Sequence, residues 1–198
     1  MPAPDIEKIV KDNLNELNRI KDRVLPVKVG RAAAESVKQN FRQGGFYGSR
    51  WKEPLRRDLG FEGAEGEYGP LLSRQDHLMS STDSIPGTAR VTIRNTAEYA
   101  SVHNEGGSMT VTPKMKKYFW ARFFRSSGER SGSAARKPAT SREASFWKAM
   151  ALKRAGSLIR IPRRRFLGES PQLTRLVSNI INKELKAFIN GIDSRKYH

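Results

Sequence analysis

Apolar residues recur at steps of three and four residues at both ends of this chain, and this periodicity is the strongest constraint on its fold. The N-terminal pattern covers residues 4–24 and predicts an amphipathic helix. Residues 26–41 predict another helix, and the two form either a hairpin or one kinked rod. The C-terminal pattern predicts a helix over residues 171–189, which Gly191 stops.

Strand signals occur only between these helical ends. Residues 78–85 and 88–95 are short β-prone runs that flank Pro86-Gly87, which predicts a hairpin with its turn at Pro86 and Gly87. In the second run Val91 and Ile93 alternate with polar residues, so we expect them to share one face.

Residues 44–70 are rich in glycine and predict a long loop. Trp51 and Leu55 are the side chains of this loop that we expect to return to the core. A short helix is predicted at residues 97–105, with Gly106-Gly107 as its stop, followed by a strand at residues 109–112.

A last strand is predicted at residues 157–161, far along the chain from the others. The order of elements predicts an α+β protein, in which a small antiparallel β-sheet is packed by N- and C-terminal helices, with a long basic insertion between strands. We expect a single domain over residues 1–198, with a helical N-terminal region (1–43), a basic, aromatic-rich insertion or arm (113–156), and the last strand and C-terminal helix (157–190).

The formal net charge of +17 is concentrated in one segment. Residues 113–165 hold sixteen Lys or Arg and two Glu, which is +14. Such asymmetry indicates an anionic partner, which can be nucleic acid, a membrane surface or an acidic protein face. The candidate partner- or DNA-facing residues are Lys114, Lys116, Lys117, Arg122, Arg125, Arg160, Arg163, Arg164 and Arg165. No membrane partner is expected, because no apolar run approaches the roughly 18 residues of a membrane span.

Aromatic side chains accompany these cations on one predicted helix, residues 114–125. They are Tyr118, Phe119, Trp120, Phe123 and Phe124. Aromatics next to cations can stack on bases, but aromatics and arginine are also enriched where one protein subunit docks on another. We favour the protein interface. The Ser- and Gly-rich residues 126–141 that follow have no means of forming a core.

A basic corner joins the last strand to the C-terminal helix. Pro162 cannot donate a hydrogen bond to a β-ladder, so the strand should end there, and Ser170-Pro171 reads as a helix start. The arginines 163–165 are thus held at a junction. They face either an acidic partner or solvent.

The residue types of an enzyme are scarce. The chain has no cysteine, three histidines, and none of the P-loop, nucleophile-elbow or zincin motifs. His103 is more simply interpreted as a partly buried residue at a helix end than as a catalytic or metal-binding group. We therefore expect a non-enzymatic protein without a cofactor or metal.

Several short motifs resemble one known family. Trp51-Lys-Glu-Pro-Leu55, Tyr99-Ala-Ser-Val-His-Asn-Glu-Gly-Gly107 and Ile161-Pro-Arg-Arg-Arg-Phe-Leu-Gly168 occur in an order and spacing similar to those of the virion morphogenesis proteins of Mu-like tailed phages. These are related to the tail completion proteins of P2-like phages. The resemblance covers roughly residues 26–190. Its structural motif residues are Trp51, Tyr99, His103, Gly106, Gly107, Pro162, Phe166 and Gly168.

The resemblance implies a structural virion protein of a tailed bacteriophage, made in the host cytoplasm and built into the head-tail junction or the tail end. Neck, tail completion or terminator proteins of this kind assemble as homo-oligomeric rings. Its partners would be other neck, tail and connector proteins, and contact with packaged DNA is left open. The alternative from composition alone is a non-specific nucleic-acid-binding protein that uses residues 113–165.

Overall fold

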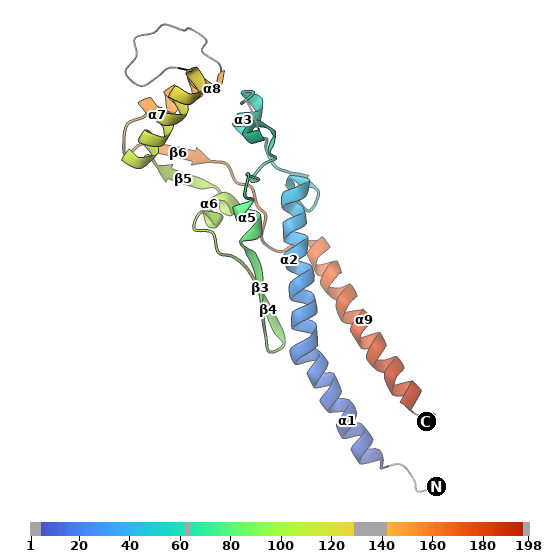
Figure 1. Ribbon diagram of the computed structural model, residues 1–198. Coiled ribbons are helices and arrows are strands. Elements are labelled where there is room, and N and C mark those ends of the chain that lie inside the picture. The colour runs from blue at the N-terminus through green and yellow to red at the C-terminus, as the bar shows by residue number, and fades with distance from the viewer. Residues whose placement is uncertain (1–4, 62–63, 129–141, 196–198) are drawn as a thin grey trace. The chain divides into compact units, whose positions relative to one another are not determined.

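The computed structural model describes residues 5–61, 64–128 and 142–195 (Figure 1). The chain forms two compact units that interleave along the sequence. The first unit comprises Met1–Asn40, Ser80–Thr96 and Leu167–His198, and the second comprises Phe41–Met79 and Ala97–Phe166. Helices together with antiparallel strand pairs confirm the predicted α+β class. Most of the Ser- and Gly-rich stretch, residues 129–141, lies outside the described residues.

The first unit begins with an uninterrupted helical rod. It consists of α1 (Ile6–Arg19), a π-helical turn η1 (Ile20–Val24) and α2 (Leu25–Gln43). The rod continues past Pro26, which lacks the N–H that would bond to the carbonyl of Asp22. The Asp22 carbonyl instead accepts from the Ala89 N–H at 3.5 Å. An outside donor and a π-helical turn therefore let the helix tolerate its proline, as expected for a kinked rod.

A two-stranded hairpin packs against this rod. β3 (Thr82–Gly87) pairs with β4 (Arg90–Asn95), and the turn lies at Thr88-Ala89, where Ala89 has φ +52°. The predicted turn at Pro86-Gly87 is wrong, because both residues still pair across the ladder. A Cβ at Gly30 of α2 would lie 2.8 Å from Val91 Cγ2, so the close approach of helix and hairpin requires glycine.

The alternation predicted in β4 is confirmed: Val91 and Ile93 are half-buried, whereas Arg90, Thr92 and Arg94 are exposed. Leu78, placed in a strand by the sequence pattern, belongs instead to the short helix α5 (His77–Ser80). The observed turn lies two residues after the predicted one. A shift of two residues leaves the same side chains on each face of the hairpin, so the alternating pattern alone could not locate the turn.

The first unit ends with α9 (Pro171–Arg195). The Ser170 hydroxyl accepts from the Leu173 N–H at 3.0 Å, which confirms the predicted helix start. The predicted stop at Gly191 is wrong, since the helix runs through it to Arg195. Lys28 Nζ of α2 lies 2.7 Å from Glu184 Oε1 of α9, an ion pair that joins the two helices. Figure 1 shows α2 and α9 side by side.

The second unit contains short elements and one longer helical pair. They are β1 (Gly45–Phe46), β2 (Ser49–Arg50), α3 (Leu55–Asp58), α4 (Ala64–Glu67), α6 (Ala100–Glu105), β5 (Gly107–Thr110), α7 (Pro113–Ser127), α8 (Arg142–Leu152) and β6 (Leu158–Ile161). In the described residues the strands form three separate antiparallel pairs, β1–β2, β3–β4 and β5–β6. The helices α7 and α8 lie between β5 and β6 in sequence.

Aromatic packing forms the core of the second unit. Phe41 and Phe166 are 0% and 1% exposed, with ring centroids 4.8 Å apart, and the Trp51 ring packs edge-on against Phe41 at 5.7 Å. Trp51 thus returns to the core as predicted. Leu55 does not: its side chain is 58% exposed, and that prediction is wrong. Leu55 opens α3 directly after Pro54, and this short helix carries the side chain away from the core.

Candidate functional site

The basic segment folds as a helical hairpin of α7 and α8. Thr112 caps α7 by accepting from the Met115 N–H at 3.2 Å, and Pro113 occupies the first turn, where its missing N–H costs nothing. Phe119 and Phe123 of α7 are 6% and 5% exposed. Phe119 stacks on Trp147 of α8, with centroids 6.0 Å apart and planes at 28°. Burial of each phenylalanine contributes about 1.5–3 kcal/mol.

A buried ion pair also joins the two helices. Arg122 Nη2 lies 3.2 Å from Glu143 Oε1, and the side chains are 14% and 10% exposed. The Trp147 indole N–H donates to the same carboxylate oxygen at 3.0 Å, while the Arg122 guanidinium lies 5.1 Å from the Trp147 ring centroid. Glu143 therefore neutralises one cation of the basic segment and orients one aromatic ring.

The predicted interface aromatics have unequal access to solvent. Tyr118 is 54% exposed, and Trp120 and Phe124 are half-buried and stacked on each other with centroids 5.8 Å apart. Phe119 and Phe123 are buried against α8 and stabilise the hairpin itself. Of the five, Tyr118, Trp120 and Phe124 are available to a partner.

The predicted basic residues also divide by exposure. Lys114, Lys117, Arg125, Arg160 and Arg163 are exposed, Lys116, Arg122 and Arg165 are half-buried, and Arg164 is buried. The structure does not bring all nine to one face. Lys148, Lys153 and Arg154 on or just after α8 are exposed cations that the sequence analysis did not single out, although all three belong to its basic segment.

The three arginines of the corner contact three different places. Arg163 Nη2 lies 3.3 Å from Glu105 Oε2, in an exposed ion pair. The Arg164 guanidinium donates to the Lys52 and Glu53 carbonyls at 3.1 and 3.5 Å. The Arg165 guanidinium lies 4.6 Å from the Phe46 ring centroid. All three therefore have contacts within the chain, and Arg164 is the most enclosed.

Charge is poorly compensated around Arg164. Burial, and then the neighbouring Arg56, lower the pKa of this guanidinium, while Glu53 opposes them. Among the described residues no carboxylate forms an ion pair with Arg164, whose guanidinium donates to the neutral carbonyls of Lys52 and Glu53. The two guanidiniums lie close enough for the charge of Arg56 to disfavour the charged form of Arg164.

The family-type motifs meet at the same corner. The Trp51 indole N–H donates to the Arg165 carbonyl at 2.8 Å, and the Phe166 N–H donates to Asn104 Oδ1 at 2.9 Å. The Arg164 N–H donates to the His103 carbonyl at 2.8 Å. Segments far apart in sequence are thereby fixed to one another. The role of Asn104 in holding Phe166 was not predicted, although Asn104 lies within the Tyr99–Gly107 motif.

Gly106 is required by a close approach at this corner. Its φ is +75°, and a Cβ there would lie 3.0 Å from the Arg163 N. Gly107 follows as the first residue of β5, Pro162 lies exposed directly after β6, and Gly168 has φ +144°. These motif residues shape the backbone around the corner.

His103 is enclosed within this corner. Its pKa lies below the ordinary histidine value, first because of burial and then because of the Arg164 charge. Its Nδ1 has no hydrogen-bond partner among the described residues, and Tyr99 packs edge-on against the ring at 5.8 Å. A neutral, packed histidine agrees with the structural interpretation of this residue.

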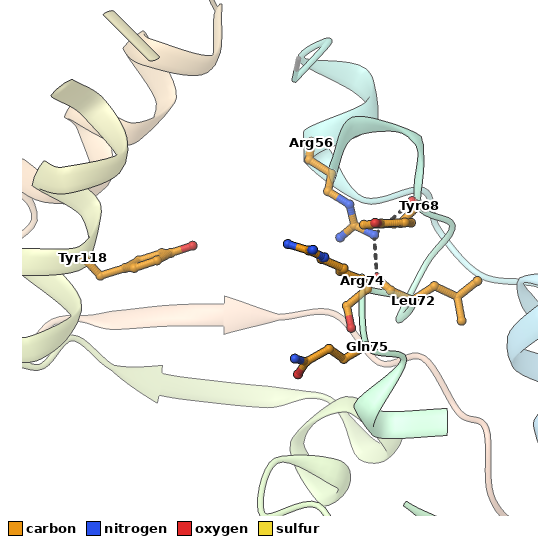
Figure 2. Close-up of a pocket in the computed structure, with 7 residues that line it drawn as sticks. Arg56, Tyr68, Leu72, Arg74, Gln75 and Tyr118 are labelled. Carbon is orange, nitrogen blue, oxygen red and sulfur yellow. Dashed lines mark hydrogen bonds between the residues drawn. The ribbon is translucent and has the colours of Figure 1, made fainter. Parts of the chain in front are cut away.

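Two adjoining hollows open beside the hairpin. One, of ≈ 970 Å³, is lined by Lys52, Glu53, Pro54, Leu55, Arg56, Phe61, Gly107, Ser108, Tyr118, Phe146, Trp147, Ile159, Arg160, Ile161, Pro162 and Arg164. The other, of ≈ 620 Å³, shares Arg56 and Tyr118 with it. Figure 2 shows Tyr118 projecting from α7 across this second hollow towards Arg74 and Gln75.

Arg56 shapes the wall between these hollows. One of its guanidinium nitrogens, Nη2, donates to the carbonyls of Tyr68, Gly69 and Leu72, at 3.0, 2.7 and 3.2 Å. Figure 2 shows Arg56 with Tyr68 and Leu72. The glycine-rich loop is thus held by a residue that the sequence analysis missed. In the sequence, the one indication of this role is the position of Arg56 directly after the Trp51–Leu55 motif.

The described residues contain no group of three or more His, Cys, Asp or Glu side chains placed to hold a metal ion. No helix among them combines the length and apolar character needed to cross a membrane.

Residues 5–186 match the profile of the phage virion morphogenesis family, which confirms the resemblance seen in the motifs. No curated protein and no solved structure is significantly similar to the chain.

Proposed function

Because the chain belongs to the phage virion morphogenesis family and so has a structural or assembly role in phage particles, we propose that it is a ring-forming subunit at the head-tail junction. In this role it would act as a neck, tail completion or terminator protein, with a structural rather than catalytic task. Its partners would be copies of itself and other neck, tail or connector proteins.

The observation that most supports ring formation is an exposed apolar face on α1. Ile6, Ile9, Val10 and Leu14 are 72%, 48%, 51% and 55% exposed. Their spacing places them on one side of the helix, and Asp5 caps that helix by accepting from the Lys8 N–H at 3.1 Å. A contiguous apolar face on a soluble helix is a characteristic of protein-protein contact surfaces. Contacts of one subunit's face with a different surface of the next close into rings.

The distribution of charge supports a position on the path of the DNA. Exposed cations lie on α7 and α8, including Lys114, Lys117, Arg125 and Lys148. A ring at the head-tail junction surrounds the passage through which DNA moves, and cations near phosphates are favourable there.

The ring is tested on the purified full chain by native mass spectrometry, and its position by electron microscopy of virions in which the protein is labelled. A closed oligomer and a label at the junction are expected. A strictly monomeric protein that is absent from virions would overturn the proposal.

Non-specific DNA binding is the second candidate function, and the same exposed cations favour it. Affinity for duplex DNA would then fall steeply with rising salt, because bound phosphates release counterions. Replacing Lys114, Lys117 and Arg125 by Glu should abolish that binding. A protein whose DNA affinity is absent or independent of salt excludes this function and leaves the subunit role.

A further inference from the structure

The ≈ 970 Å³ hollow of the second unit has apolar walls that are open to water. Leu55 on one wall and Tyr118 on the other are 58% and 54% exposed. Phe61, at the end of the Leu55 wall, packs against Phe146 and Trp147 of α8, with centroids 5.7 and 5.6 Å away. These contacts hold the wall that contains Leu55 and Phe61 against the wall formed by α7 and α8. A hollow of this size and lining is typical of a preformed binding groove.

The charge of the lining is positive. Among the described residues that line the hollow, Lys52, Arg56, Arg160 and Arg164 are cationic, and Glu53 is the one carboxylate. Glu53 already lies 2.9 Å from Arg57 in an ion pair. In the part of the adjoining hollow that the structure describes, the lining adds Arg74 and no acidic side chain. An occupant with carboxylates would therefore be attracted and held in register.

The edge of β6 supplies a backbone template. Among the described residues β6 pairs with β5 alone, so its other edge is open. Consecutive residues Ile159, Arg160 and Ile161 all line the hollow. Successive side chains of a strand point to opposite faces, so a hollow that touches three in a row includes the strand edge. Such an edge can accept an added strand.

We propose that this groove binds an extended segment of a different virion protein, in which acidic side chains alternate with apolar ones, as a strand added to β6. The proposal rests on the proposed function, because it names the kind of partner that this subunit would hold. Alternation follows from strand geometry: one face of the added strand meets Leu55 and Ile159, and the other meets Arg160.

The observations favour this occupant over a second copy and over nucleic acid. A neighbouring copy would bring its own basic unit, from a chain of net charge +17, against a positive groove. Duplex DNA is too broad to enter the hollow. Of the described aromatic rings that line it, Phe61, Phe146 and Trp147 pack on one another. Tyr118 is the exposed ring among them, and one ring does not form a stacking platform for successive bases.

Binding is tested with the full chain and a fluorescent peptide in which Asp alternates with Leu or Phe, by fluorescence anisotropy. One control peptide has Asn in place of Asp, and another has Ser in place of the apolar residues. We expect the first peptide to bind and each control to bind at least about tenfold more weakly. Equal binding of all three, or no binding of the first, overturns the proposal.

Matched variants locate the site. Leu55→Glu should weaken binding at least about tenfold by removing an apolar contact and repelling Asp, whereas Leu152→Glu, at a leucine 64% exposed outside the groove, should not. Arg160→Glu should act like Leu55→Glu, with the exposed Arg175→Glu on α9 as its control. Equal losses in variant and control overturn the groove as the site. A short oligothymidylate that binds more tightly than the peptide and is weakened by Leu55→Glu assigns the groove to nucleic acid instead.

The oligomeric state of the same proteins separates this proposal from the ring. A protein that forms rings without binding the peptide overturns the groove alone. A protein that binds the peptide but remains monomeric supports the groove and overturns the ring.

Discussion

The two units bury their apolar residues to different degrees. In the second unit the rings of Phe41, Trp51 and Phe166 and the facing sides of α7 and α8 are enclosed within the chain. In the first unit the apolar side of α1 stays exposed, and the apolar residues of α9 are half-buried at most in the described part of that helix. The first unit also buries apolar residues, at Ile20, Val29, Ala33 and Val37, but its helices α1 and α9 present faces suited to further contacts. Similar amphipathic patterns lead to both results.

A buried polar network distinguishes α7, which is covered by another helix, from α1, which is not. α7 is held to α8 by Arg122, Glu143 and Trp147, whose polar atoms meet inside the hairpin. The described part of α1 has ion pairs only at its surface, such as Arg19 with Glu16 at 2.7 Å. Exposed pairs of this kind stabilise little.

Glu143→Gln should give the largest effect, a loss of about 3–5 kcal/mol in the free energy of unfolding, because it leaves the buried Arg122 without its counter-charge. Chemical denaturation at neutral pH measures it. Glu98→Gln, at an exposed position, is the control and should change stability by less than about 0.5 kcal/mol. Equal values for the two variants would show that the hairpin is not held by this pair.

Trp51→Phe should cost about 1–3 kcal/mol in the free energy of unfolding, because the part-buried Arg165 carbonyl loses its hydrogen bond at 2.8 Å while the aromatic packing is largely kept. Trp120→Phe makes the same change at a half-buried ring on α7 and should cost less. If Trp120→Phe lowered the free energy of unfolding more than Trp51→Phe, the α7–α8 hairpin and not the corner would contribute more to stability.

His103 predicts a pH dependence confined to the second unit. Because its pKa is lowered in the folded chain, the unfolded chain binds the proton first as pH falls. Its contribution is complete above about pH 6.5, the ordinary histidine value, and stability is lost as pH falls from there towards the lower folded pKa. His103→Gln should flatten the stability curve in this window. A His103→Gln variant that keeps the original slope in this window would contradict the assignment.

Leu14→Asn should have the smallest effect on stability, within about 0.5 kcal/mol, because the side chain is 55% exposed. It should nevertheless weaken assembly, measured by native mass spectrometry at equal protein concentration. Lys11→Asn on another side of α1 is the control and should assemble normally. A destabilised Leu14→Asn monomer would show that this face is covered within the chain, and the contrast between the units would fail.

Local patterns sufficed for much of the secondary structure. The rod of α1 and α2, the helices α7 and α9 and the alternation in β4 follow from patterns along the sequence, because an apolar stripe must pack against another surface. The turn of the β3–β4 hairpin and the end of α9 were misplaced. Pro86, Gly87 and Gly191 are strong breakers in isolation, yet ladder pairing and helix continuation outweighed them here.

The candidate site was harder to predict, because it depends on which distant residues meet. The sequence located the basic segment and the corner, but not that Arg164 would turn inwards to the Lys52 carbonyl while Arg163 stays at the surface. Neighbouring residues of one type are indistinguishable until packing assigns each a partner. The ion pair of Glu143 could have been anticipated, because this residue is one of two carboxylates among sixteen cations in the basic segment.

By itself, the sequence of this protein determined the α+β class, the family and the location of its charge, because periodicity, motif order and composition are properties of the chain alone. Only the tertiary structure decided that Trp51 enters the core while Leu55 lines an open groove. The physical reason is that burial is a relation between segments: an apolar side chain is hidden or exposed according to what packs against it, and no local pattern records that.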